Sequence, residues 1–93
     1  MREKEIELQL TKSVKAKEGI AFKFVSPGHA GVPDRLVLLP GAHIGFVEVK
    51  APGQEPRKLQ LAMHRLIRRL GFKVYVLDDQ DQIGGILDDI QAT

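Results

Sequence analysis

Two short apolar runs, with an acidic residue before the first and another near the end of the second, most strongly constrain how this chain can fold. The runs are Arg35–Leu39 and Ile44–Val49, and the turn-forming segment 40–43 separates them. This pattern predicts a β-hairpin. Asp34 comes directly before the first run, and Glu48 lies near the end of the second. Because hairpin strands are antiparallel, both carboxylates are expected at one end of the sheet.

The register of this hairpin decides whether the two carboxylates meet. Residues i and i+2 of a strand share a face, so Glu48 and Lys50 point one way and the neighbouring valines point into a core. Asp34 joins that face only if the numbers of cross-strand partners add to an even value. An odd-length turn such as Pro40-Gly41-Ala42, or a bulge, meets this condition. The opposite parity would place Asp34 and Glu48 on different faces.

Converging carboxylates would define a particular chemistry. Two such groups repel each other, and one becomes protonated unless a cation lies between them. Hard oxygen ligands favour Mg²⁺ or Mn²⁺, and the backbone carbonyl of Val49 is a candidate third ligand. Lys50 beside the pair could orient an attacking water, help to deprotonate it, or offset charge on a phosphate. These are the parts of metal-assisted phosphodiester hydrolysis, although Pro-Asp turns and Glu-Val-Lys strands are each common elsewhere.

The order of these residues resembles a known nuclease pattern. Pro33-Asp34 followed by Glu48-Val49-Lys50 is similar to the PD-(D/E)XK superfamily. The longer pattern 31–34 (Gly-Val-Pro-Asp), 48–53 (Glu-Val-Lys-Ala-Pro-Gly) and Gln60 resembles a small stand-alone VRR-NUC domain. The resemblance covers essentially the whole chain. It implies a restriction-endonuclease-like fold, a divalent metal and structure-selective DNA cleavage, with small members similar to homodimeric Holliday junction resolvases.

The segment before the hairpin predicts a helix, a strand and a loop. Apolar residues recur at helical spacing over 3–17, and Gly19 is expected to end this helix. Residues 20–25 alternate as a strand that should pair with the hairpin. Ser26–Gly31 then forms a loop of mostly small residues that would let a DNA backbone approach closely. His29 in this loop is a candidate phosphate contact, or an ordinary exposed histidine.

The first helix also carries a candidate metal ligand. Glu3 falls near the centre of the apolar stripe, and Glu7 lies at its edge. A carboxylate on a buried stripe requires a partner. Because the resemblance implies that a first-helix Glu completes the metal site, Glu3 is the predicted ligand and Glu7 the alternative. The competing interpretation is a frayed helix end at which both are solvated.

The second half of the chain predicts helix, strand and helix. The first of these helices starts near Pro56 or Arg57 and ends near Leu70, with Gln60 and His64 one turn apart on a neighbouring face. Its predicted apolar face consists of Leu59, Met63, Leu66, Ile67 and Leu70. The resemblance implies that Gln60 reaches the active site, where it can hold Lys50 or a metal-bound water. Residues 73–77 form a strand parallel to the Glu48 strand, because a crossover connection is right-handed. A last helix follows at about 81–91, and its apolar face is expected to pack on the sheet or form a dimer contact.

Together these elements predict a single α/β domain spanning residues 1–93. Their order is α-β-β-β-α-β-α, with a mixed four-stranded sheet flanked by helices. The chain has no Cys, which excludes a disulfide framework and a zinc-thiolate site. Its first residues are charged rather than a signal peptide, and no apolar run approaches the ~20 residues of a membrane span. A cytoplasmic location, in a bacterial or phage-infected host cell, is therefore expected.

Charge placement indicates where nucleic acid would bind. The net charge is only +2, but basic residues cluster in and around the predicted 57–70 helix, and acidic residues gather near the C-terminus. A basic patch suits phosphate contact, although it can equally be a solvated helix face. The predicted DNA contacts are Arg57, Lys58, Arg65, Arg68 and His29.

The resulting hypothesis is a Mg²⁺- or Mn²⁺-dependent endodeoxyribonuclease. Its predicted catalytic residues are Asp34, Glu48, Lys50 and Gln60. The expected substrate is branched DNA, cut by a homodimeric Holliday junction resolvase. One alternative is the same chemistry on flap, nicked or duplex DNA. The other is a DNA-binding module without catalysis, which has no reason to retain all of Asp34, Glu48 and Lys50.

Overall fold

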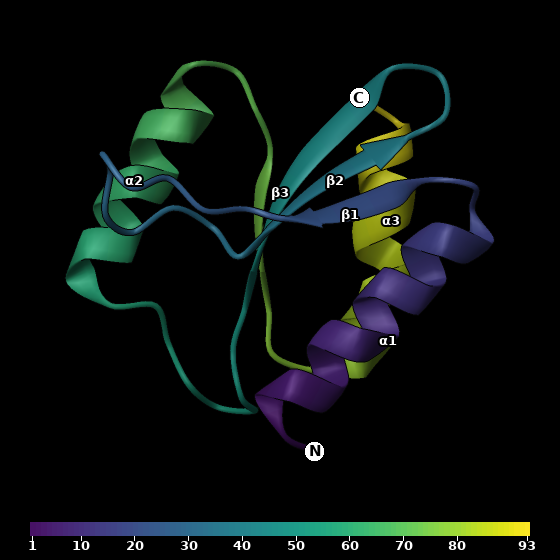
Figure 1. Ribbon diagram of the computed structural model, residues 1–93, viewed down its shortest axis with the longest axis horizontal. Helices are drawn as coiled ribbons and strands as arrows, with labels where there is room; N and C mark the ends of the chain where they lie inside the picture. The colour runs from purple at the N-terminus through teal and green to yellow at the C-terminus, as the bar shows by residue number, and fades with distance from the viewer.

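The predicted hairpin forms the centre of a four-stranded sheet with the strand order β1-β2-β3-β4 (Figure 1). The computed structural model describes all residues from Met1 to Thr93. The elements, in chain order, are α1 (Glu3–Ala16), β1 (Ile20–Lys23), β2 (Arg35–Leu39), β3 (His43–Val49), α2 (Lys58–Arg69), β4 (Val74–Leu77), the 3₁₀ turn η1 (Gln80–Gln82) and α3 (Ile83–Gln91). The predicted order of helices and strands, with its mixed sheet, is confirmed.

The hairpin has the parity that the site requires. Arg35 pairs with Val47 and Leu39 with His43, so the turn is the three-residue loop 40–42. Gly41 and Ala42 both have positive φ in this loop, at 91° and 66°. One step beyond the Arg35–Val47 pair, the same register brings residues 34 and 48 opposite each other. The predicted register is therefore confirmed.

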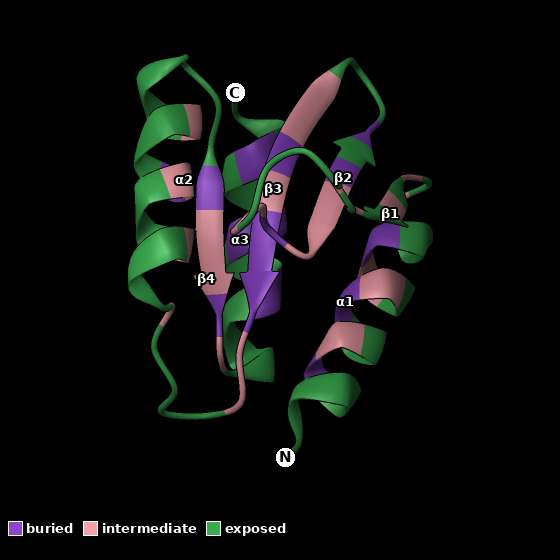
Figure 2. Ribbon diagram, turned by 60° about the vertical axis from the view of Figure 1, so that its left-hand side comes forward, coloured by how far each residue is buried: buried purple, intermediate pink, exposed green.

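Helices α1 and α3 cover one face of the sheet and enclose the core (Figure 2). The strands contribute buried Val37, Val47, Val49 and Leu77 to this core. The apolar face of α3, at residues 83, 86, 87 and 90, is also buried there. Of the two roles that the sequence left open for this face, the structure therefore assigns it to the core. None of the helices has the length and hydropathy needed to cross a membrane.

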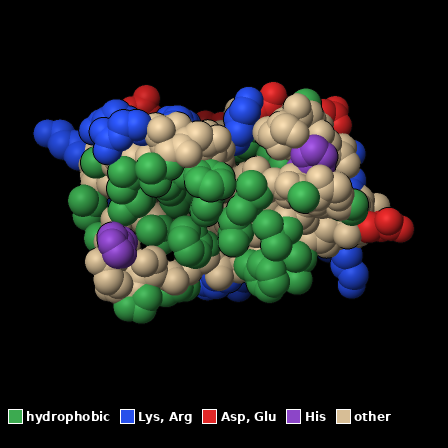
Figure 3. Space-filling model, turned by 90° about the horizontal axis from the view of Figure 1, so that it is seen from above, with side chains coloured by type: hydrophobic (Ala, Val, Ile, Leu, Met, Phe, Trp, Pro, Cys, Tyr) green, Lys and Arg blue, Asp and Glu red, His purple; other side chains and the backbone are tan.

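Helix α2 lies alone on the opposite face, over the β3–β4 side (Figures 1 and 2). Its only buried residue is His64, whereas Leu59 and Leu70 of the predicted apolar face are 59% and 66% exposed. The side of α2 that contacts the sheet is thus the neighbouring, partly polar one. Because α2 does not extend over β1, Ile20 and Phe22 remain 48% exposed, and Figure 3 shows hydrophobic side chains spread across this face.

The connection between α1 and β1 differs from the prediction. The helix ends at Ala16, and Glu18 rather than Gly19 takes the left-handed conformation, with φ of 64°. Gly19 is required for space instead, because a Cβ there would collide with the carbonyl oxygen of Leu38. Strand β1 ends at Lys23 rather than Val25, although the Phe24 amide still donates to the carbonyl of Asp34 at 2.8 Å.

Two glycine substitutions should distinguish a glycine that is required for space from one that is not. Gly19→Ala is expected to destabilise the fold by roughly 1–3 kcal/mol, because backbone must move to admit the methyl group. Gly85→Ala is the matched control: it lies on the exposed side of α3, and a Cβ added there would have no other atom within 4 Å. It should stabilise the fold by roughly 0.5–1 kcal/mol. Urea unfolding monitored by circular dichroism measures both, and equal effects would contradict the packing described for Gly19.

Candidate active site

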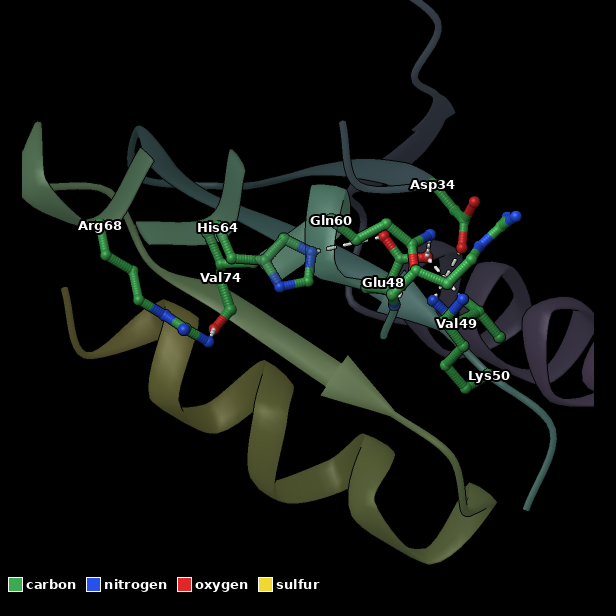
Figure 4. Close-up of polar contacts among 9 residues, drawn as sticks. Asp34, Glu48, Val49, Lys50, Gln60, His64, Arg68 and Val74 are labelled. Atoms are coloured by element: carbon green, nitrogen blue, oxygen red, sulfur yellow. Dashed lines mark hydrogen bonds and ion pairs between the residues drawn. The ribbon is translucent and has the colours of Figure 1, made fainter. Parts of the chain in front are cut away.

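Asp34 and Glu48 meet where β2 begins and β3 ends (Figure 4). Asp34 follows Pro33, which is buried, and precedes the first residue of β2. Its Oδ2 accepts a hydrogen bond of 2.8 Å from the backbone amide of Val49. This bond fixes the Asp34 carboxylate against the end of β3, beside Glu48.

Glu48 is almost completely buried, with 1% of its surface exposed, and its two oxygens have different partners. The Gln60 side-chain amide donates to Oε2 at 2.9 Å, and the Lys50 ammonium lies 3.6 Å from the same oxygen. On the other side, His64 Nε2 lies 3.4 Å from Oε1. The structure therefore gathers all four predicted catalytic residues, although Gln60 binds Glu48 rather than Lys50.

The pair of carboxylates is electrostatically unbalanced. Burial, followed by the charge of Asp34 and its hydrogen bond, raises the pKa of Glu48 to about 7, and the Lys50 ammonium only partly offsets this. Burial and the positive charges of Arg68 and Lys50 lower the pKa of His64, so its ring is neutral at neutral pH. A further cation beside Asp34 and Glu48 would therefore be favourable.

This donor set fits Mg²⁺ or Mn²⁺ better than an ion that requires a full protein cage. No group of three or more His, Cys, Asp or Glu side chains surrounds the site. Mg²⁺ commonly binds through one or two carboxylates and keeps several waters. Asp34, Glu48 and the carbonyl of Val49 are the groups that would hold such an ion.

Gln60 is held in place by the start of its own helix. Its Oε1 accepts a 2.8 Å hydrogen bond from the Arg57 amide, which leaves Nε2 to face Glu48. The loop that leads to Asp34 packs on the same turn. Gly31 has φ of 86°, and a Cβ there would lie 2.7 Å from the carbonyl oxygen of Leu59. Close contact at Gly31 thus couples the position of the loop to the start of α2.

The first-helix carboxylates do not join this group. Glu3 is exposed, so the expectation that it lies on the buried stripe is wrong: the stripe begins one turn later, at Ile6. Glu7 instead forms a 2.7 Å ion pair with Arg35, whose guanidinium also donates to the carbonyl of Ala21. Arg35 lies on the core side of β2, and this pairing accounts for Glu7.

The predicted DNA contacts have different surroundings. Arg57, Lys58 and Arg65 are exposed on α2, and His29 is exposed in the loop before Asp34. Arg68 donates to the carbonyl of Val74 at 2.8 Å, and this bond ties α2 to β4. Contact of these residues with DNA stays a prediction. The site residue that sequence reasoning missed is His64, for which the signal was its position one turn after Gln60.

Comparisons with known proteins relate the chain to nucleases. No family model matches the chain. A curated relative, "Putative nuclease p44" of Acyrthosiphon pisum secondary endosymbiont phage 1, is 54% identical over 81 residues, which cover 87% of each chain. A solved structure described as "VRR_NUC domain" superposes with a TM-score of 0.86 at 30% identity, covering 92% of this chain and 94% of that one. Fold and site thus define a nuclease of restriction-endonuclease-like fold. The chain belongs to the VRR-NUC nuclease family.

The raised pKa of Glu48 predicts a measurable effect on stability. The unfolded chain releases this proton near its ordinary value of 4.5, but the folded protein releases it near 7, so stability should fall as the pH rises through that window. Glu48→Gln removes the charge and should stabilise the metal-free fold by roughly 1–3 kcal/mol above pH 7, but not near pH 5.

Urea unfolding in EDTA between pH 5 and 8 tests this expectation. Asp88→Asn is the matched control, because the Asp88 side chain is 75% exposed on α3. Its stability should follow the wild-type pH profile. Parallel profiles for wild type and Glu48→Gln would contradict the electrostatic strain assigned to Glu48.

Proposed function

We propose that this nuclease is a Mg²⁺- or Mn²⁺-dependent endonuclease that cleaves branched DNA as a homodimeric Holliday junction resolvase. The observation that carries the catalytic part is the placement of the Asp34 carboxylate, bound to the Val49 amide, beside the Glu48 carboxylate, with Lys50 and Gln60 around Glu48. The phage origin of the relative supports action in the cytoplasm of an infected bacterial host.

The side chains of the site divide the work of hydrolysis. Asp34, Glu48 and the carbonyl of Val49 would hold the divalent cation, which offsets charge on phosphate oxygens and favours ionisation of the attacking water. Lys50 is only 13% exposed, so its ammonium acts in a partly desolvated setting, where it orients the water or neutralises developing charge. Gln60 keeps Glu48 turned toward Asp34.

The exposed cations of α2 would lie along the DNA backbone. Arg57, Lys58 and Arg65 project from the helix that also carries Gln60, and Lys and Arg side chains gather over α2 at the left of Figure 3. His29 lies in the loop on the adjacent side. Phosphate contacts at these positions would position the duplex without selecting a sequence, as structure-selective cleavage requires.

The uncovered face of the sheet supports the homodimer. Ile20 pairs with Leu38 and Phe22 with Leu36, so these four side chains share one face. At least a third of the surface of Ile20, Phe22 and Leu38 is exposed. A contiguous exposed apolar face indicates an interaction surface. We assign it to a second copy, because two active sites related by a two-fold axis can cut two strands of a symmetric junction.

Cleavage of labelled four-way junction, flap and linear duplex DNA tests the catalytic proposal. Wild type should make paired cuts in the junction in Mg²⁺ or Mn²⁺ and none in EDTA. Asp34→Asn retains an oxygen that can accept from the Val49 amide but removes the charge, so it should lower the rate at least ~100-fold. Asp88→Asn, the exposed control, should cleave like wild type.

Each other outcome points to a specific alternative. Metal-dependent cuts confined to flap, nicked or duplex DNA would retain the chemistry and replace the substrate. Tight junction binding without cleavage in either metal would support a DNA-binding module instead. Equal cleavage by wild type and Asp34→Asn would contradict the assigned site.

Sedimentation of wild type and two surface variants tests the homodimer. Ile20→Thr/Phe22→Thr replaces the apolar face with residues that retain β propensity, and it should raise the dimer dissociation constant at least ~10-fold. Leu8→Thr is the control, because Leu8 is 53% exposed on α1, away from this face. A wild type that is monomeric at all concentrations would contradict the dimer and favour flap or duplex substrates.

A further inference from the structure

His64 is an unusual residue for its place in the fold. It is completely buried on a helix whose other residues are exposed or half-buried. Its Nδ1 is the only buried side-chain nitrogen or oxygen without a hydrogen-bond partner. A buried polar atom without a partner costs free energy, so stability alone would favour an apolar side chain at this position.

The contact on its other nitrogen supplies a reason for the histidine. His64 Nε2 faces Oε1 of Glu48, an oxygen that neither Gln60 nor Lys50 contacts. Gln60 and Lys50 both contact Oε2. Without His64, neither α2 nor Lys50 would hold Oε1, and the plane of the carboxylate would be freer to turn away from Asp34.

The helix positions this contact accurately. Gln60, His64 and Arg68 follow one another at intervals of four, so they form a single stripe along α2. Arg68 binds the carbonyl of Val74, and Gln60 is fixed by the amide of Arg57. The imidazole thus lies between two fixed points, and Figure 4 shows its ring directed at Glu48.

We propose that His64 is a positioning residue, which holds Oε1 of Glu48 so that the carboxylate faces Asp34. An ionised carboxylate only accepts hydrogen bonds, so His64 carries its hydrogen on Nε2, and Nδ1 retains a lone pair. The effect of this contact on metal affinity rests on the proposed function. The contact itself does not.

Three substitutions separate hydrogen bonding from shape. His64→Gln places an amide donor near the position of Nε2, His64→Asn places one near Nδ1 and cannot reach Glu48, and His64→Leu retains bulk without a donor. Titration of each with Mn²⁺ in a calorimeter should show affinity reduced roughly 10–100-fold for Leu and Asn, the range typical of groups that orient metal ligands. The Gln variant should remain within about threefold of wild type. Thermal unfolding by circular dichroism verifies that each variant is folded.

A second measurement requires no metal. Nitrogen NMR of the His64 ring in EDTA, at a pH well above 7 so that Glu48 is ionised, should show the Nε2–H tautomer in wild type and loss of that preference in Glu48→Ala. An Nδ1–H ring, or an unchanged ring in Glu48→Ala, would overturn the proposed contact.

The two measurements fail independently. If His64→Leu binds Mn²⁺ as tightly as wild type, the role of His64 is limited to filling space. The same conclusion follows if His64→Gln binds Mn²⁺ no more tightly than His64→Leu. A wild type that binds no Mn²⁺ would overturn the metal-dependent function, and the ring nitrogens would still decide whether His64 holds Glu48.

Discussion

Burial of Glu48 beside Asp34 is energetically unfavourable, because it raises the pKa of the Glu48 carboxyl to about 7, and much of the surrounding structure serves to maintain it. Water would relieve the repulsion between the two carboxylates if it could enter, but the Glu48 side chain is 1% exposed. Polar groups from β3 and α2 therefore take the place of water. Such fixed groups do not have to reorganise when charge changes during a reaction, which is the advantage of a pre-organised site over bulk solvent.

This demand explains why α2 contacts the sheet through polar side chains. A helix that only covered a core would bury its leucines, whereas α2 leaves Leu59 and Leu70 exposed and directs Gln60 and His64 at the sheet. The other face of the sheet, packed by α1 and α3, supplies the apolar core. The two faces thus have separate tasks, stability on one and chemistry on the other.

Much of this arrangement could be predicted from the sequence, because local rules govern it. Strand alternation and loop length determine the side on which Asp34 and Glu48 lie, and both are readable from residues 34–50. The orientation of α2 could not be predicted. Its sequence has a clear apolar face, which is the side normally expected to be buried, and only the tertiary contacts show that the neighbouring side meets the sheet. The prediction for Glu3 failed for a related reason. Helical periodicity placed it on the apolar stripe, but the first turn of α1 is exposed and burial begins only at Ile6.

The three-residue loop between β2 and β3 has an evolutionary consequence. Deleting or inserting one residue there would turn every side chain of β3 to the opposite face of the sheet. Glu48 would then point into the core, and Val49 would replace it at the site. A change of two residues would preserve the facing. Related chains should therefore vary this loop in steps of two, and a relative with an even-length loop should carry a compensating bulge.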